Sequence, residues 1–509
     1  MSEEKLNIIS YHTFVFPFLW DQGGKLTRKG FEKKLIQDTN WQKDVLDPKA
    51  VPDGRTYAQQ QYFNHAARNA MFVRKNDTQA AVHNFTYDFG KLLGDEGWLA
   101  SEKNHTNPVH LLLEKESDGF GVGLSVRGVR LKLYNTGVGL LLFELSNYAL
   151  SGEKNINKIN EYGRRLFMPY VDFAGNCGDC VDTMTLRIGR EKVESRISGR
   201  ALTALDDVPL PELIRFFLKK GEYTVTANQK RGKKELFIEP IIDDRMFTLC
   251  YYIDPDFVAA MANWDEENQC YAYLADVQKR PTVCKESLAR RMYEMMFVDG
   301  NGLTCHSRSM LAESLEKNLY TRWLGYTFDD GTCAGTVTGI TEYSMVTVST
   351  SGFVAETAFL PEYVEMACLV LAQRASLLAF EKRISESAKG KASISKIQRS
   401  YVIFQGQLLL REVTPQQQGI ELYDLLLEQL MIQKEAQEIE AQLNAMFALE
   451  QTLQQQQEGL LLGVLAVISV FDAVRFFVED NSLGTMLSGG GLAAVLALIF
   501  LLARKKRIR

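Results

Sequence analysis

The chain has 509 residues and a net charge of −5, and this length accommodates two or three domains. Its mildly acidic balance gives no general signal for nucleic-acid binding, so we expect no direct nucleic-acid partner. Charged residues make up 24% of the sequence, a share typical of soluble proteins. Most of the chain is therefore predicted to be globular α+β material, with membrane-spanning segments confined to the C-terminal end.

The N-terminal part is predicted from its β-rich runs. Residues 7–20 are rich in aromatic and β-branched side chains and indicate a buried strand, which Pro17 ends or marks as an edge. Strong β signals follow at 110–113, 126–134 and 139–145. Asn135, Thr136 and Gly137 separate the last two runs, and Asn and Gly tolerate the positive φ of a hairpin turn. We assign residues 1–240 to an N-terminal α/β domain.

Residues 241–360 are predicted to form a second α/β part. Runs with β character recur at 246–253 and 343–349. Thr338 and Gly339 repeat the Thr136-Gly137 of the first turn, which is a weak sign of a diverged repeat.

Cysteine and histidine spacing gives no complete metal site. Cys177 and Cys180 form a lone CxxC pair, whereas a tetrahedral zinc site needs four ligands. The spacing leaves open half of a zinc site, a redox motif or two ordinary loop cysteines. The sequence contains no phosphate-binding loop and no nucleophile–base motif. We therefore expect a non-enzymatic protein without a certain cofactor.

A helical region, 361–458, is predicted next. Pro361 has the position of a first-turn proline, and Thr414-Pro415 interrupts the pattern. A helix from about 420 to 457 follows, roughly 55 Å long. Its apolar residues step by four and three, which indicates a stalk that packs on other helices; a long helix buried on its own domain is the alternative. These residues are Ile432, Ala436, Ile439, Leu443, Met446 and Leu453.

Two apolar segments, 459–478 and 486–503, predict a transmembrane hairpin, because a span needs roughly 20 mostly apolar residues. The alternative is one span plus a buried core helix. Five Lys and Arg residues occupy the tail, 504–509. Since basic residues stay on the cytoplasmic side, we expect a multi-pass protein of the inner (cell) membrane with both termini in the cytoplasm.

Polar residues in and after the first apolar segment are candidate pore residues. Ionisable side chains inside a span usually face a bundle interior or an aqueous path, and acidic rings attract cations. The alternative places the ionisable pair at 472 and 475 in the outer interface of the membrane. The candidates are Ser469, Asp472, Arg475, Glu479 and Asp480.

The order of an α/β domain, a stalk helix, two C-terminal spans and a basic tail resembles the CorA family of pentameric cation channels. The Gly-Met-Asn motif of that family is missing, and Phe477-Val-Glu-Asp-Asn stands in its place. A closer resemblance is to the CorA-like proteins associated with type III CRISPR systems. It is carried by Tyr134-Asn-Thr-Gly-Val-Gly, Asn160-Glu-Tyr-Gly-Arg-Arg, Ala372-Gln-Arg-Ala-Ser-Leu-Leu and Glu412-Val-Thr-Pro-Gln-Gln-Gln-Gly-Ile-Glu-Leu-Tyr.

This resemblance implies a homo-oligomeric, pentameric membrane channel for antiviral defence, in which the N-terminal domain senses a nucleotide second messenger. The messenger would be a conjugate of S-adenosylmethionine and AMP. A divalent-cation (magnesium) transporter and a membrane-anchored interaction protein without a pore are the alternatives.

Arginines near the first hairpin turn are candidate ligand contacts, because an anionic nucleotide needs cations and free backbone amides. In a regular strand Arg127 and Arg130 point to opposite faces, unless a bulge at Gly128 realigns them. The alternatives are that these arginines are solvated, or that the site lies near Thr338 and Gly339. The candidates are Arg127, Arg130, Asn135, Thr136, Gly137, Arg164 and Arg165.

Overall fold

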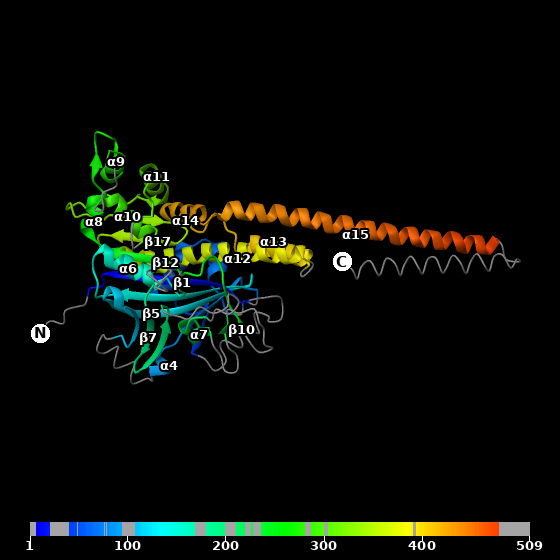
Figure 1. The fold of residues 1–509 in the computed structure, drawn as a ribbon, viewed down its shortest axis with the longest axis horizontal. Coiled ribbons are helices and arrows are strands. Elements are labelled where there is room, and N and C mark those ends of the chain that lie inside the picture. Colours follow the sequence, from blue (N-terminus) through cyan, green and yellow to red (C-terminus); the bar gives the residue numbers. More distant parts are fainter. Residues whose placement is uncertain are drawn as a thin grey trace.

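The computed structural model describes residues 7–20, 40–47, 49–75, 77, 79–93, 107–167, 180–198, 210–218, 225–226, 236–279, 287–299, 304–389 and 393–477. These residues form a mixed α and β fold in which helices cover both faces of one large sheet (Figure 1). The C-terminal part of this region is helical, and its last helix projects far from the sheet (Figure 1).

In the part of the chain that the structure describes, the sheet has 13 strands, and their pairing is antiparallel except between β12 and β17. Its main path runs β15 (Leu319–Tyr320), β16 (Thr336–Ile340), β17 (Ser344–Ser349), β12 (Phe247–Ile253), β1 (Ser10–Leu19), β6 (Val138–Asn147), β5 (Phe120–Tyr134), β4 (Val109–Lys115), β7 (Thr183–Ile188) and β8 (Glu191–Arg196). Off this path, β11 (Glu239–Pro240) pairs with β1, while β3 (Val82–Tyr87) pairs with β5 and with β2 (Trp41–Asp44).

The strands predicted at 110–113, 126–134 and 139–145 are confirmed as parts of β4, β5 and β6. Strands β12, β16 and β17 extend the sheet that contains β1. The regions 1–240 and 241–360 therefore share one sheet.

Pro17 neither ends β1 nor lies on an edge strand, so that expectation is wrong. Its partner on β6 is Leu140. On the other side of β1, pairing with β12 stops at Val15 and pairing with β11 starts at Phe18. The Pro17 carbonyl accepts from the amide of Ile241 on that side, so the missing amide donor of proline falls where the ladder is interrupted.

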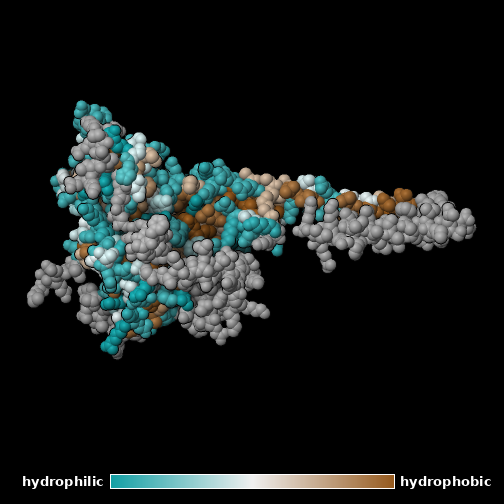
Figure 2. Space-filling model, in the orientation of Figure 1, coloured by the Kyte–Doolittle hydropathy of each residue, from teal (hydrophilic) through white to brown (hydrophobic). Residues whose placement is uncertain are grey.

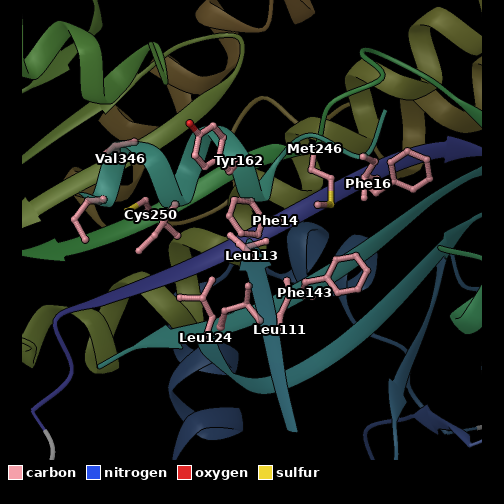
Figure 3. Close-up of a cluster of buried hydrophobic side chains, with 14 of the residues drawn as sticks. Phe14, Phe16, Leu111, Leu113, Leu124, Phe143, Tyr162, Met246, Cys250 and Val346 are labelled. Carbon is pink, nitrogen blue, oxygen red and sulfur yellow. The ribbon is translucent and has the colours of Figure 1, made fainter. Parts of the chain in front are cut away.

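Alternate residues of β1 enter two different cores, as the two-residue period of a strand requires. Phe14, Phe16 and Phe18 pack with β4, β5 and β6 residues on one face (Figure 3). Helices on that face are α6 (Glu153–Gly163), α7 (Glu212–Leu218), α8 (Pro255–Met261), α9 (Ala272–Lys279), α10 (Leu288–Met296) and α11 (Arg308–Asn318). Because both faces are covered, β1 and β6 are buried along their whole length.

The opposite face packs against α2 (Gly54–Tyr62), α3 (His65–Met71) and the helices of the C-terminal part. The core there joins β1, β5 and β6 to α2, α3, α12 (Val364–Ala388), α13 (Ile394–Gln407), α14 (Gln417–Gln429) and α15 (Ile432–Phe477). The remaining short elements are α4 (Gly90–Leu93), a 3-10 turn (Glu116–Asp118), β9 (Val225–Thr226), β10 (Leu236–Phe237), β13 (Trp264–Asp265) and β14 (Cys270–Tyr271).

A π-helix, Ala355–Tyr363, leads directly into α12. Pro361 lies inside it, so the predicted first-turn position is wrong. The wide turn accommodates a residue without an amide donor, and the amide of Val364 bonds to the carbonyl of Phe359 five residues earlier. The carbonyls of Leu360 and Pro361 also accept side-chain hydrogen bonds, from Arg55 and Gln59. These bonds attach α2 to the π-helix.

The expectation of one continuous stalk helix from about 420 is wrong, because the helix breaks after α14. Met431 has a φ of 54°, which a right-handed helix cannot contain. Ile432, Ala436, Ile439 and Leu443 then pack on the chain's own core, and the Tyr401 hydroxyl donates to the Ala436 carbonyl. In this stretch the heptad seam therefore packs against other helices of the same chain.

The far end of α15 exposes apolar side chains. Leu460, Leu461, Leu462, Leu465 and Val470 are between 54% and 66% exposed. Figure 2 shows hydrophobic surface along this part of the helix. The second predicted segment, 486–503, and the tail lie outside the described residues.

One helix in the described part of the chain, Ala355–Ala388, is long and apolar enough to cross a membrane. Of its apolar window, 89% is buried inside the protein. We therefore interpret it as the core helix that covers the sheet.

Candidate functional site

A cleft opens between the sheet, α2 and the π-helix. Two adjoining hollows form it, of about 370 Å³ and about 620 Å³. Arg55 and Arg127 line both. The first hollow is bordered by β3, β5 and β6, and the second by β1, β6 and the π-helix.

A β-bulge brings Arg127 and Arg130 to the same face. The register between β5 and β6 shifts between Val126 and Gly128, and both arginines line the first hollow. The alternative that a bulge at Gly128 realigns them is therefore confirmed. A Cβ at position 128 would come within 3.1 Å of Glu144 Oε2, so a glycine suits this close approach.

A buried ion network forms the floor of the first hollow. Arg130 pairs with Glu144 at 2.8 Å and also with Glu365, while Lys132 pairs with Glu365 at 2.7 Å. Burial alone would raise the pKa of Glu365, but Lys132 and Arg130 outweigh it and lower that pKa to about 2. Since Glu365 lies in the first turn of α12, the network ties β5 and β6 to that helix.

Arg127 and Arg55 differ from the network cations because neither forms an ion pair within the described ranges. The Arg127 guanidinium lies over the Tyr11 ring, 5.1 Å from its centroid. Arg55 donates to the Leu360 carbonyl at 3.3 Å. Both side chains are exposed, so their charge is accessible to an anion in the cleft.

Within the described residues, two polar atoms at the cleft are buried without a hydrogen-bond partner. Ser146 Oγ lines the second hollow, and its side chain is 1% exposed. Arg130 Nε belongs to a residue that lines the first hollow. Orphaned buried polar atoms are uncommon and indicate a site that a ligand or water completes.

The predicted turn residues lie outside both hollows. Asn135, Thr136 and Gly137 form the β5–β6 turn, with Gly137 at a φ of 89° as expected. Asn135 Nδ2 donates to Gln407 at 2.7 Å, and the Thr136 and Ser376 hydroxyls lie 2.7 Å apart. The turn thus fastens the sheet to α12 and α13.

Arg164 and Arg165 lie at the end of α6, which packs on the other face of the sheet. Both pair with Glu161, and Arg164 donates to the Val298 carbonyl at 3.0 Å. Both are buried. The structure therefore does not bring them together with Arg127 and Arg130.

The pore candidates are described only in part. Ser469 Oγ donates to the Leu465 carbonyl one turn back in α15, at 2.9 Å. Asp472 and Arg475 belong to the same helix, but their side chains lie outside the described residues, as do Glu479 and Asp480 entirely.

The zinc interpretation is tested only at Cys180. Cys177 lies outside the described residues, and Cys180 is buried in the core. Within the described residues, no group of three or more His, Cys, Asp or Glu side chains has the geometry to hold a metal ion.

Sequence reasoning missed Lys132, Glu144, Glu365 and Arg55. The sequence does contain a signal for Lys132. Arg130 and Lys132 stand two residues apart in an apolar strand, so their side chains face the same side of the sheet. Glu365, alone in an apolar helix run, was a second signal, because a buried charge needs a partner.

Comparisons with family models, with curated proteins and with solved structures gave no match to this chain. The resemblance to CorA-like proteins therefore stays a prediction from the sequence.

Proposed function

We propose that this protein is an oligomeric, ligand-gated membrane effector whose sheet domain binds a nucleotide-type ligand in the cytoplasm. The observation that carries the proposal is the exposed apolar end of α15, where Leu460, Leu461 and Leu462 are more than half exposed. Exposed apolar surface of this kind marks a membrane or protein contact. Here it belongs to a helix whose other end packs on the sensing core.

The membrane part of the proposal extends this observation with the sequence. The apolar run that starts at 459 continues to 478, and a second one spans 486–503. Together they would form a two-helix hairpin with both termini in the cytoplasm, because the basic tail follows the second run. Asp472, Arg475, Glu479 and Asp480 would then border the pore of a pentamer.

The cleft supports a ligand that combines negative charge with an aromatic ring. Arg55 and Arg127 offer accessible positive charge. Tyr148, Leu360 and Pro361 give the second hollow apolar walls, which aromatic groups favour. The conjugate of S-adenosylmethionine and AMP, which the resemblance implies, has both features. Type III CRISPR antiviral defence is the function proposed on that basis.

The packing supports a route from the cleft to the exposed end of α15. Glu365 of α12 belongs to the cleft, and α12 packs with α15 in one core. Arg374 of α12 also pairs with Glu435 of α15. The rival function, divalent-cation transport, rests on the architectural resemblance alone.

Membrane attachment is tested by fractionating cells that express the full chain or a chain ending at Glu458. We expect the full chain to stay in the membrane pellet after an alkaline wash and the shortened chain to stay soluble and folded. A full chain that washes off the membrane would refute the proposal.

A further inference from the structure

The cleft contains two kinds of cation. Arg130 pairs with Glu144 at 2.8 Å, and Lys132 pairs with Glu365 at 2.7 Å. Carboxylates therefore already neutralise both cations. Arg127 and Arg55 form no ion pair within the described residues. Against the effect of burial, they help Arg130 to lower the pKa of Glu144 from a greater distance. An entering anion gains most from charges that no carboxylate already satisfies.

We propose that Arg127 and Arg55 receive the phosphate of the ligand, whereas the Arg130–Glu365–Lys132 cluster passes the binding event to α12. This inference rests on the proposed function, since it assumes a nucleotide-type ligand. It assigns binding and coupling to different residues of one cleft.

The binding half follows from position and exposure. Arg127 and Arg55 are the two arginines shared by both hollows. A phosphate placed between them keeps the rest of the ligand free to occupy the larger hollow. The guanidinium of Arg127 is already held over the Tyr11 ring, so little side-chain freedom is lost when it binds.

The coupling half follows from the shared floor of the cleft. Arg127 and Arg130 line the same hollow, and Arg130 Nε has no partner. A phosphate beside Arg127 competes with Glu144 and Glu365 for Arg130. The pair between Arg130 and Glu365 then weakens, and this pair is one of the two, with Lys132–Glu365, that hold the start of α12 to β5.

The adjoining π-helix gives this weakened contact a mechanical consequence. It ends at Tyr363, two residues before Glu365, and π-helical turns are frequent at functional sites. Its carbonyls at Leu360 and Pro361 accept side-chain hydrogen bonds from Arg55 and Gln59 of α2. When Glu365 is released, α12 can shift relative to the sheet and carry α15 with it.

Binding is measured by calorimetry on the detergent-solubilised full chain, with AMP, S-adenosylmethionine and their conjugate as probes. We expect Arg127→Gln to weaken conjugate binding by about tenfold or more, the loss of a charge-assisted contact. The matched control is Arg187→Gln, an exposed arginine of β7 that lines neither hollow. It should bind as the wild type does.

Coupling is measured as dye release from vesicles of phosphatidylethanolamine and phosphatidylglycerol that contain the protein. We expect Glu365→Gln to bind the conjugate at least as tightly as the wild type, because the carboxylate that competes with the phosphate for Arg130 is removed. The variant should also leak without ligand. Lys132→Gln breaks the same cluster from the strand side and should also leak, which covers the case in which the first variant fails to fold.

The outcomes separate this inference from the proposed function. A wild type that binds none of the three probes overturns the proposed function. A wild type that binds the conjugate while Arg127→Gln binds it equally well overturns the assignment of the phosphate. Glu365→Gln and Lys132→Gln vesicles that stay sealed until ligand is added overturn the coupling.

Discussion

The buried ion network makes a quantitative prediction about stability. Glu365→Gln keeps the shape of the side chain but leaves Lys132, which is 4% exposed in its side chain, without a carboxylate. Stranding a buried charge costs about 3–5 kcal/mol. Lys132→Met should cost less, about 1.5–3 kcal/mol, because Glu365 keeps its pair with Arg130.

The double variant separates this account from a simple packing effect. With Lys132→Met and Glu365→Gln together no charge is stranded, and the pair between Arg130 and Glu144 remains. The double variant should therefore lose less unfolding free energy than the two single variants lose together, by at least about 1.5 kcal/mol.

The assay is urea unfolding of the full chain in detergent, followed by the fluorescence of the buried Trp20 and Trp41. Acid provides an internal check. Because the folded pKa of Glu365 is about 2, its contribution is complete above about pH 4.5 and is lost as the pH falls toward 2. Additive losses, or a Glu365→Gln variant within about 0.5 kcal/mol of the wild type, would refute the reasoning.

Three further predictions test other parts of the structure. Burial lowers the pKa of His12 to about 4. The free energy of unfolding should therefore fall by up to about 3 kcal/mol as the pH drops from 6.5 to 4. In urea unfolding measured over this pH range, His12→Gln should remove most of that fall. Ile439→Glu should destabilise the domain by about 3 kcal/mol, because Ile439 packs inside the chain, whereas Leu453→Glu, at a 43% exposed position, should leave the urea midpoint unchanged. Gly128→Ala should crowd Glu144. It should therefore lower the melting temperature by a few degrees and weaken conjugate binding in calorimetry. If neither value changes, the bulge does not have the role in the cleft that is assigned to it.

The strands were predictable where alternation and turn residues acted together. The hairpin of β5 and β6 is an example, since Asn135 and Gly137 mark a turn between two apolar runs. Pro17 could not be placed correctly, because its tolerance depends on a gap between β11 and β12 that pairing creates far away in sequence.

The helical region shows the same division. Apolar spacing predicted that Ile432 and Ile439 pack on other helices, but spacing does not say whether those helices belong to the same chain. The break at Met431 has no proline or glycine to announce it. It arises from tertiary packing, which overrides local propensity.

Of the arginines that line the candidate site, Arg127 and Arg130 were predictable from the sequence and Arg55 was not. Arg127 and Arg130 stand in the cleft, while Asn135 and Arg164 serve contacts elsewhere. Their separation follows from the sheet: the turn lies at the ends of β5 and β6, where it contacts α12 and α13, and α6 packs on the opposite face. Glu365, more than two hundred residues further on, joins the site only through the packing of α12.

The central claim is that ligand binding in the sheet domain opens a membrane path. Its most direct test is the release of a trapped dye from vesicles that contain the purified wild type, oriented with the cleft on the outside. The conjugate of S-adenosylmethionine and AMP is added to the outer solution. We predict rapid release with the conjugate and none with AMP or S-adenosylmethionine alone. Vesicles that stay sealed although the protein is inserted and binds the conjugate would contradict the account.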